Sequence, residues 1–150
     1  KIQYSSLRIK RSLNFGKWTI DNSIMYQVVN QNDNILNLPQ FISRNTLYFK
    51  ERIFKNTLSI QTGINFKIFS KFYANEYNPL ISAFHVQSQK KIGGFPLFDF
   101  FFNAKIRQTK IFIIAEHINS SISGNSFYST PESVYRDFGV RFGFKWNLFN

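Results

Sequence analysis

The chain contains no cysteine. A disulfide framework, a thiolate metal site and a cysteine nucleophile are therefore all excluded. The chain also lacks an uninterrupted apolar run of the roughly 18 or more residues that a membrane-spanning helix requires. A helical membrane protein is excluded on this ground. A β-barrel is not excluded, because its strands are apolar on one face only.

Acidic residues are scarce. Eight Asp and Glu stand against 19 Lys and Arg, which gives a formal net charge of +11 at pH 7. This excess of positive charge suits a polyanionic partner, but basic residues also line pores and meet anionic lipid headgroups.

The sequence begins at Lys1, with neither an initiator methionine nor a secretory signal pattern. We therefore expect this to be a processed or truncated end.

Aromatic residues, by contrast, make up 19% of the 150 residues, a length with room for one domain. The final segment shows how they are arranged. Every even position from Phe138 to Leu148 is apolar, whereas the odd positions from Asp137 to Asn147 are Asp, Gly, Arg, Gly, Lys and Asn. A period of two places these sets on opposite faces of a β-strand. One aromatic and one polar face on a long strand are typical of transmembrane barrels, with lipid outside and water inside.

Similar segments recur along the chain, separated by two kinds of connection. Three connections are short, at 15–17, 54–56 and 108–109, and three are long and polar, at 30–42, 73–96 and 120–135. The two kinds alternate strictly, as periplasmic turns and external loops do in bacterial barrels. We expect strands at about 4–14, 18–29, 43–53, 57–72, 97–107, 110–119 and 136–149.

The predicted fold class is all-β, an antiparallel transmembrane β-barrel. The alternation gives the first and last strands the same direction and hence an odd number of strands, whereas complete single-chain bacterial barrels have even numbers and no free edge. We therefore expect residues 1–150 to be one barrel segment, the C-terminal seven or eight strands of a larger barrel. The alternative is a small closed barrel of eight strands, in which Ala83–Gln87 belongs to a full spanning strand.

The polar faces of these strands are predominantly basic. Rings of Lys and Arg lower the barrier for anions and raise it for cations, so this face predicts a weakly anion-selective diffusion channel. The alternative is a solvated wall whose charge is neutralised by acidic residues on further strands. The acidic residues of the face are Asp21, Asp99, Glu116 and Asp137, and its basic residues are Arg8, Lys10, Lys50, Arg52, Lys67, Lys71, Lys105, Arg107, Arg141 and Lys145.

A set of motifs is spread over most of the chain. They are Leu36-Asn37-Leu38-Pro39-Gln40-Phe41, Arg44-Asn45-Thr46-Leu47-Tyr48-Phe49, Gln61-Thr62-Gly63, Tyr73-Ala74-Asn75-Glu76-Tyr77-Asn78-Pro79, Ile92-Gly93-Gly94-Phe95-Pro96, Phe100 to Lys105, Ala115-Glu116-His117, Asn125-Ser126-Phe127-Tyr128 and Arg141-Phe142-Gly143-Phe144-Lys145-Trp146. Together these motifs resemble the C-terminal part of the putative porins of Bacteroidetes outer membranes. The resemblance implies an outer-membrane β-barrel of pore function without catalytic residues, in a family whose members are much longer than this chain.

The same resemblance implies that barrel-assembly machinery recognises the C-terminal strand. Such signals usually end in an aromatic residue on the apolar register, whereas here Phe149 is off that register and Asn150 is last. The residues assigned to this signal are Phe142, Phe144, Trp146, Leu148 and Phe149.

Catalytic and metal sites are not predicted. His85 and His117 are the only histidines, with no second histidine at ligand spacing, so a surface or rim position is expected for both. Ser120, Ser121 and Ser123 follow His117, but closeness in sequence does not create the geometry of a serine hydrolase. We therefore predict no enzyme, no cofactor and no metal.

Three hypotheses of function follow, in this order. The first is a passive outer-membrane porin for small solutes. The second is a barrel subunit or client of an outer-membrane assembly or secretion complex. The third is a soluble basic nucleic-acid-binding protein, but stacking aromatics would then share a face with the charges, and here the two segregate. The expected location is the bacterial outer membrane. The expected partners are outer-membrane lipid and lipopolysaccharide, the barrel-assembly machinery and other outer-membrane proteins, with no nucleic acid.

Overall fold

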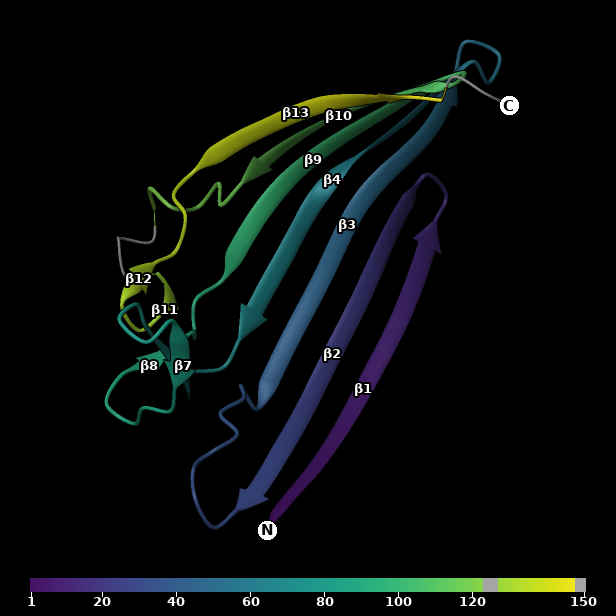
Figure 1. The fold of residues 1–150 in the computed structure, drawn as a ribbon. Coiled ribbons are helices and arrows are strands. Elements are labelled where there is room, and N and C mark those ends of the chain that lie inside the picture. The colour runs from purple at the N-terminus through teal and green to yellow at the C-terminus, as the bar shows by residue number, and fades with distance from the viewer. Residues whose placement is uncertain (123–126, 148–150) are drawn as a thin grey trace.

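The computed structural model describes residues 1–122 and 127–147. Seven long strands form one antiparallel sheet, in which each strand pairs with the next long strand along the chain (Figure 1). No helix in the described ranges is long and apolar enough to cross a membrane. The long strands are β1 (Ile2–Phe15), β2 (Trp18–Gln31), β3 (Phe41–Ile53), β4 (Leu58–Phe69), β9 (Leu97–Ile106), β10 (Thr109–Glu116) and β13 (Gly139–Trp146).

All seven long strands occur where the alternation of apolar and polar residues predicts them. Three boundaries differ by three residues. β4 ends at Phe69 rather than at 72, β10 ends at Glu116 rather than at 119, and β13 begins at Gly139 rather than at 136, because the chain leaves the sheet for the long loops at these points. The predicted end of the last strand, Leu148 and Phe149, lies outside the described residues. The alternation of short turns with long loops is confirmed, and the two kinds of connection lie at opposite ends of the sheet (Figure 1).

Six short strands lie in the long loops as three separate pairs. They are β5 (Phe72–Tyr73) with β8 (Lys91–Ile92), β6 (Glu76–Asn78) with β7 (Ala83–His85), and β11 (Tyr128–Thr130) with β12 (Ser133–Val134). The closed barrel of eight strands is therefore not found. Residues Ala83–His85 form a small hairpin with Glu76–Asn78, in which Asn78 accepts a hydrogen bond from the backbone of Leu80, instead of crossing the sheet.

The seven-stranded sheet is open. Among the described residues, β1 pairs only with β2, and β13 pairs only with β10. Each of these edge strands presents one row of backbone N–H and C=O groups without a partner strand. The structure thus shows a curved antiparallel sheet with two free edges rather than a closed cylinder (Figure 1).

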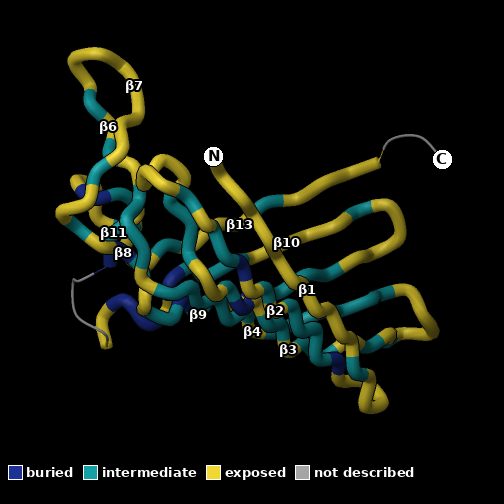
Figure 2. Tube along the Cα trace, turned by 90° about the horizontal axis from the view of Figure 1, so that it is seen from below, coloured by how far each residue is buried: buried dark blue, intermediate teal, exposed yellow. Residues whose placement is uncertain are grey.

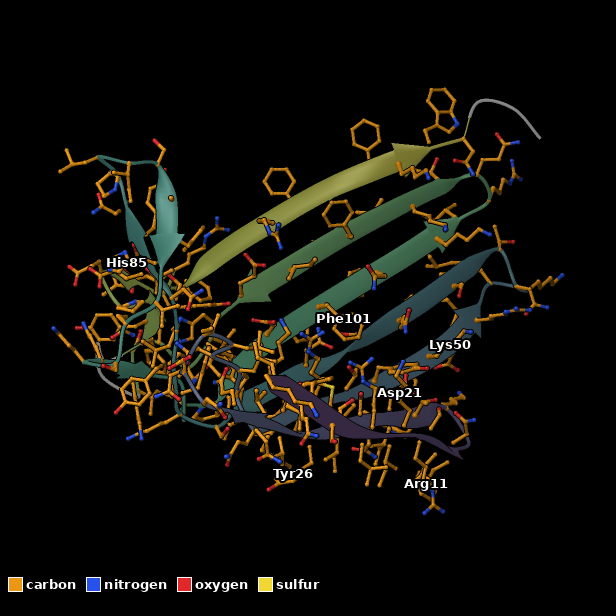
Figure 3. The ribbon with its side chains drawn as sticks, turned by 60° about the horizontal axis from the view of Figure 1, so that its bottom comes forward. Arg11, Asp21, Tyr26, Lys50, His85 and Phe101 are labelled. Carbon is orange, nitrogen blue, oxygen red and sulfur yellow. The ribbon has the colours of Figure 1, made fainter. Side chains whose placement is uncertain are left out.

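The register places polar and apolar side chains on opposite faces. Directly paired residues share a face, so one face carries the even positions of β1, β3 and β10 and the odd positions of β2, β4, β9 and β13. We call it the inner face, because Figure 3 shows Asp21, Lys50 and Phe101 in the hollow of the sheet. Arg11 and Tyr26 point away from that hollow, on the outer face.

The outer face is apolar and exposed. A continuous apolar surface of this extent is not stable in water and marks contact with lipid or protein. Its exposed large apolar side chains include Leu7, Ile9, Trp18, Ile24, Leu47, Ile64, Phe100, Ile111, Phe142 and Phe144.

Buried apolar side chains gather at the loop end of the sheet. Leu97, the first residue of β9, is buried there together with Ile92 and Phe127 of the two longest loops. Figure 2 shows buried stretches of chain near β8 at this end. Phe101 is buried nearer the middle of β9. Phe95 contacts Phe127 edge to face, with 4.6 Å between the ring centroids. The rest of the sheet has no second layer among the described residues, so its backbone ladders, rather than a core, hold the strands together.

Gly63 of β4 lies where another strand approaches closely. A Cβ atom at this position would come within 2.2 Å of the Leu47 carbonyl oxygen and 2.6 Å of Tyr48 Cβ, whereas a Cβ at Gly139 would meet nothing within 4 Å. We expect Gly63→Val to destabilise the folded protein by about 1–3 kcal/mol, because the paired strand must shift. Urea unfolding of the native polypeptide in detergent micelles measures the effect. Gly139→Val is the control, and equal losses in both variants would contradict the close approach.

Candidate functional site

Most of the basic residues predicted for the polar face do share the inner face. Arg52, Ser59 and Lys105 are paired across β3, β4 and β9, and Arg44 and Lys67 are paired across β3 and β4. The predicted residues that the register places on this face are Arg8, Lys10, Lys50, Arg52, Lys67, Lys105, Arg141 and Lys145.

Two predicted residues do not belong to the face. Lys71 lies beyond the end of β4, and its side chain lies against Gly94. Arg107 lies in the turn between β9 and β10 with a φ of 50°, which takes it out of the alternation of the strand. Both assignments continued a strand periodicity past the point where the strand ends, so both are wrong.

Two basic residues of the inner face were missed. Arg44 pairs with Ser23 and Lys67, and Lys110 pairs with Lys105 and Lys145. The signal was present in the sequence, because Arg44 has the parity of Lys50 and Lys110 has the parity of Glu116.

Two acidic residues of the inner face, Asp99 and Glu116, lie at the loop end, whereas Asp21 is the fourth residue of β2 and lies near the β1–β2 turn. Lys67 Nζ donates to Asp99 Oδ2 at 2.7 Å, and Arg141 forms an ion pair with Glu116. Asp21 accepts a hydrogen bond of 2.5 Å from Ser12 Oγ. Asp137, which was predicted to share the face, lies in the loop before β13. These two ion pairs partly neutralise the positive charge at the loop end of the face.

The centre of the inner face is apolar. Tyr48, Gly63, Phe101 and Ile114 follow one another across β3, β4, β9 and β10. The neighbouring row carries Phe112, whose ring occupies the space that a Cβ at position 143 would fill. β10 is therefore apolar on both faces in its middle, with Phe112 and Ile114 on the inner face and Ile111 and Ile113 on the outer face.

His117 is buried at the loop end rather than exposed at a rim. Its side chain is among the largest that are fully buried, and its Nδ1 donates to the Arg136 carbonyl oxygen at 2.7 Å. Its ring meets those of Phe127 and Tyr135 edge to face, and its Nε2 has no hydrogen-bond partner. The sequence could not reveal this position, because it depends on how two loops pack. The expected exposure is correct for His85, which lies 3.5 Å from the carboxylate of Glu76.

The structure does not join His117 to the serines that follow it in the sequence. The Nδ1 of His117 donates to a backbone carbonyl and its Nε2 has no hydrogen-bond partner, so neither nitrogen bonds to Ser120 or Ser121, and Ser123 lies outside the described residues. Within residues 1–122 and 127–147, no group of three or more His, Cys, Asp or Glu side chains could hold a metal ion.

The C-terminal strand presents its aromatic side chains on the outer face. Phe142, Phe144 and Trp146 of β13 are 82%, 75% and 61% exposed. Leu148 and Phe149, the other two residues of the predicted assembly signal, lie outside the described residues.

Two charged residues also lie on the outer face. Arg11 pairs with Asn22, and Glu51 forms an ion pair with Lys17 of the β1–β2 turn.

Comparison with known proteins identifies one family that the chain matches. A family model described as a putative porin matches residues 1–150. No curated protein and no solved structure matches the chain.

Asp99 connects the inner face to the loop end. Its carboxylate accepts hydrogen bonds from Lys67 Nζ and from the buried backbone N–H of His117, the latter at 3.0 Å. We expect Asp99→Ala to lower the free energy of unfolding by about 1–3 kcal/mol, because the N–H of His117 is then buried without a partner. Urea unfolding in detergent micelles measures the change. Asp21→Ala, which removes an acceptor from Ser12 only, is the control with a smaller expected loss. Equal losses would argue against the special role of Asp99.

Proposed function

Because the chain belongs to the putative porin family, we propose that it forms part of the wall of an outer-membrane β-barrel through which small solutes diffuse passively, with a preference for anions. The family implies an outer-membrane location and a non-enzymatic role. The preference for anions is the finer part of the proposal, and it depends on the charges of the inner face.

The separation of the two faces supports a position in the membrane. The long strands have 8 to 14 residues, and a tilted strand needs about 9–11 residues to cross the hydrocarbon core. The outer face offers exposed apolar side chains to outer-membrane lipid and to the acyl chains of lipopolysaccharide. The inner face offers charged and amide side chains to water, as the lumen of a porin does.

The observation that carries the preference for anions is the imbalance of charge on the inner face. Among the described strands, the acidic residues of this face are Asp21, Asp99 and Glu116. They stand against the basic residues Arg8, Lys10, Arg44, Lys50, Arg52, Lys67, Lys105, Lys110, Arg141 and Lys145. A wall with this excess of fixed positive charge attracts anions and repels cations.

The free edges support a larger barrel. In hydrocarbon, every backbone N–H or C=O group without a partner costs several kcal/mol, so a spanning sheet must close. We propose that residues 1–150 form the C-terminal wall of a barrel whose further strands pair with β1 and β13. The outward aromatic residues of β13, Phe142, Phe144 and Trp146, are the proposed contact for barrel-assembly machinery.

Ion selectivity tests the proposed preference. We expect the full-length protein in a planar lipid bilayer to show an anion-selective reversal potential in a KCl gradient. Lys50→Glu should shift that potential toward cations, because Lys50 lies on the inner face. Lys55→Glu is the matched control, because it makes the same charge change in the β3–β4 turn. A cation-selective wild-type channel would overturn the preference, and equal shifts in both variants would remove the inner face as its cause.

The mass of the native polypeptide tests the larger barrel. We expect mass spectrometry of the protein extracted from outer membranes to give a mass well above the 17.7 kDa of residues 1–150. The reason is that the open sheet needs further strands to close. A native mass of 17.7 kDa would instead require several chains to share one barrel, which crosslinking in the membrane would detect.

A further inference from the structure

A row of basic residues crosses the inner face beside the short turns. Lys105 of β9 is paired directly with Lys110 of β10, and Lys110 is paired directly with Lys145 of β13. On the other side of Lys105, the same row continues through Ser59 of β4 to Arg52 of β3. We call these five residues the turn-end basic row.

The three lysines of the row occupy adjacent strands without an interruption. Paired Cα atoms in antiparallel sheets are about 4.5–5.5 Å apart, so three ammonium groups can converge on one small ligand. All three side chains are exposed. The structure holds no ion pair for Arg52, Lys105, Lys110 or Lys145 within the described ranges, in which the ion pairs of the inner face involve Asp99 and Glu116.

The row is electrostatically unfavourable by itself. Like charges directly opposite one another destabilise a sheet, and here two such pairs are consecutive. The next row toward the loops contains no acidic residue that could neutralise these charges. It consists of Lys50, Gln61, Asn103, Phe112 and Gly143. A single chloride ion can neutralise one ammonium group, whereas an anion with several charged oxygens can neutralise two or three at once.

The neighbouring side chains suit the oxygen atoms of such an anion. The Ser59 hydroxyl lies within the row, and the amides of Gln61 and Asn103 lie in the next row. All three groups donate hydrogen bonds, as do the ammonium groups. Across these two rows the inner face of the described strands carries no carboxylate that would repel an anion.

We infer that the turn-end basic row binds small multivalent oxyanions such as inorganic pyrophosphate. The inference rests on the proposed function, because it makes the inner face of the barrel the path of the solute. It goes further in assigning one site and one chemical class, anions with two or more adjacent charged oxygens. The short turns of bacterial barrels face the periplasm, so the site lies at the periplasmic mouth.

Direct binding tests the inference without requiring conduction. Isothermal titration of pyrophosphate into the full-length protein in a phosphate-free detergent, which provides no lipid phosphate, should show saturable binding that is much tighter than that of chloride. Lys110→Gln removes the central charge of the row, and we expect it to weaken pyrophosphate binding about tenfold or more. Lys110→Arg should retain binding. Lys55→Gln, in the turn at the same end of the sheet, is the matched control and should bind like the wild type.

The unfolding temperature of Lys110→Gln provides a second test, because we expect this variant to be more stable although it binds pyrophosphate more weakly. Without pyrophosphate and at low ionic strength, Lys110→Gln should raise the unfolding temperature, because it removes two like-charge contacts. This result would also show that the variant folds. An unchanged or lower temperature would mean that the row is not strained and would overturn that part of the argument.

The remaining outcomes separate the inference from the proposed function. Equal weakening in Lys110→Gln and Lys55→Gln, or wild-type binding no tighter than that of chloride, would overturn the site. Binding that depends on Lys110 in a protein that conducts no ions would support the site and end the proposal of a diffusion pore. An anion-selective channel that pyrophosphate neither binds nor blocks would support the pore and end the site.

Discussion

The register of antiparallel pairing is the constraint on which the rest of this structure depends. One strand after another is paired without a shift from β1 to β13, so the parity of a residue decides the face on which it lies. A slip of one residue in any strand would exchange its polar and apolar faces. In β9, for example, it would move Asp99 and Lys105 to the outer face and Phe100 and Phe102 to the inner face. The sheet has almost no core beneath it, so this pairing also supplies most of its cohesion.

Much of the fold could be predicted from the sequence, because the period of two is a local property. The seven long strands, the alternation of turns and loops, and the basic face all follow from it. The same rule fails where strands end. Arg107 and Lys71 continue the alternation in the sequence, but neither lies on the inner face. Arg107 lies in a turn with a positive φ, and β4 ends before it reaches Lys71. Arg44 and Lys110 could have been identified by the same parity.

The packing of the loops could not be predicted, since it depends on contacts between segments far apart in the chain. Lys90 donates to the Pro131 carbonyl oxygen, and its ammonium group lies 3.7 Å from the centroid of the Tyr128 ring. No periodicity links Lys90 to Tyr128. The burial of His117 depends on the same arrangement, in which Phe127 and Tyr135 fold back over the end of β10. The row of three adjacent lysines is an intermediate case, because its residues can be read from parity but their alignment requires the register.

The core shared by the loop after β4 and the loop after β10 has a consequence for how this end of the molecule moves and varies. Phe95 of the first loop packs on Phe127 and Tyr135 of the second, and Lys90 reaches across to Pro131. Neither loop can leave this position without exposing apolar surface of the other. The two loops therefore open as one cooperative unit, and their amide protons should exchange with solvent together. An insertion in one loop should therefore be tolerated only where it preserves the surface on which the other loop packs.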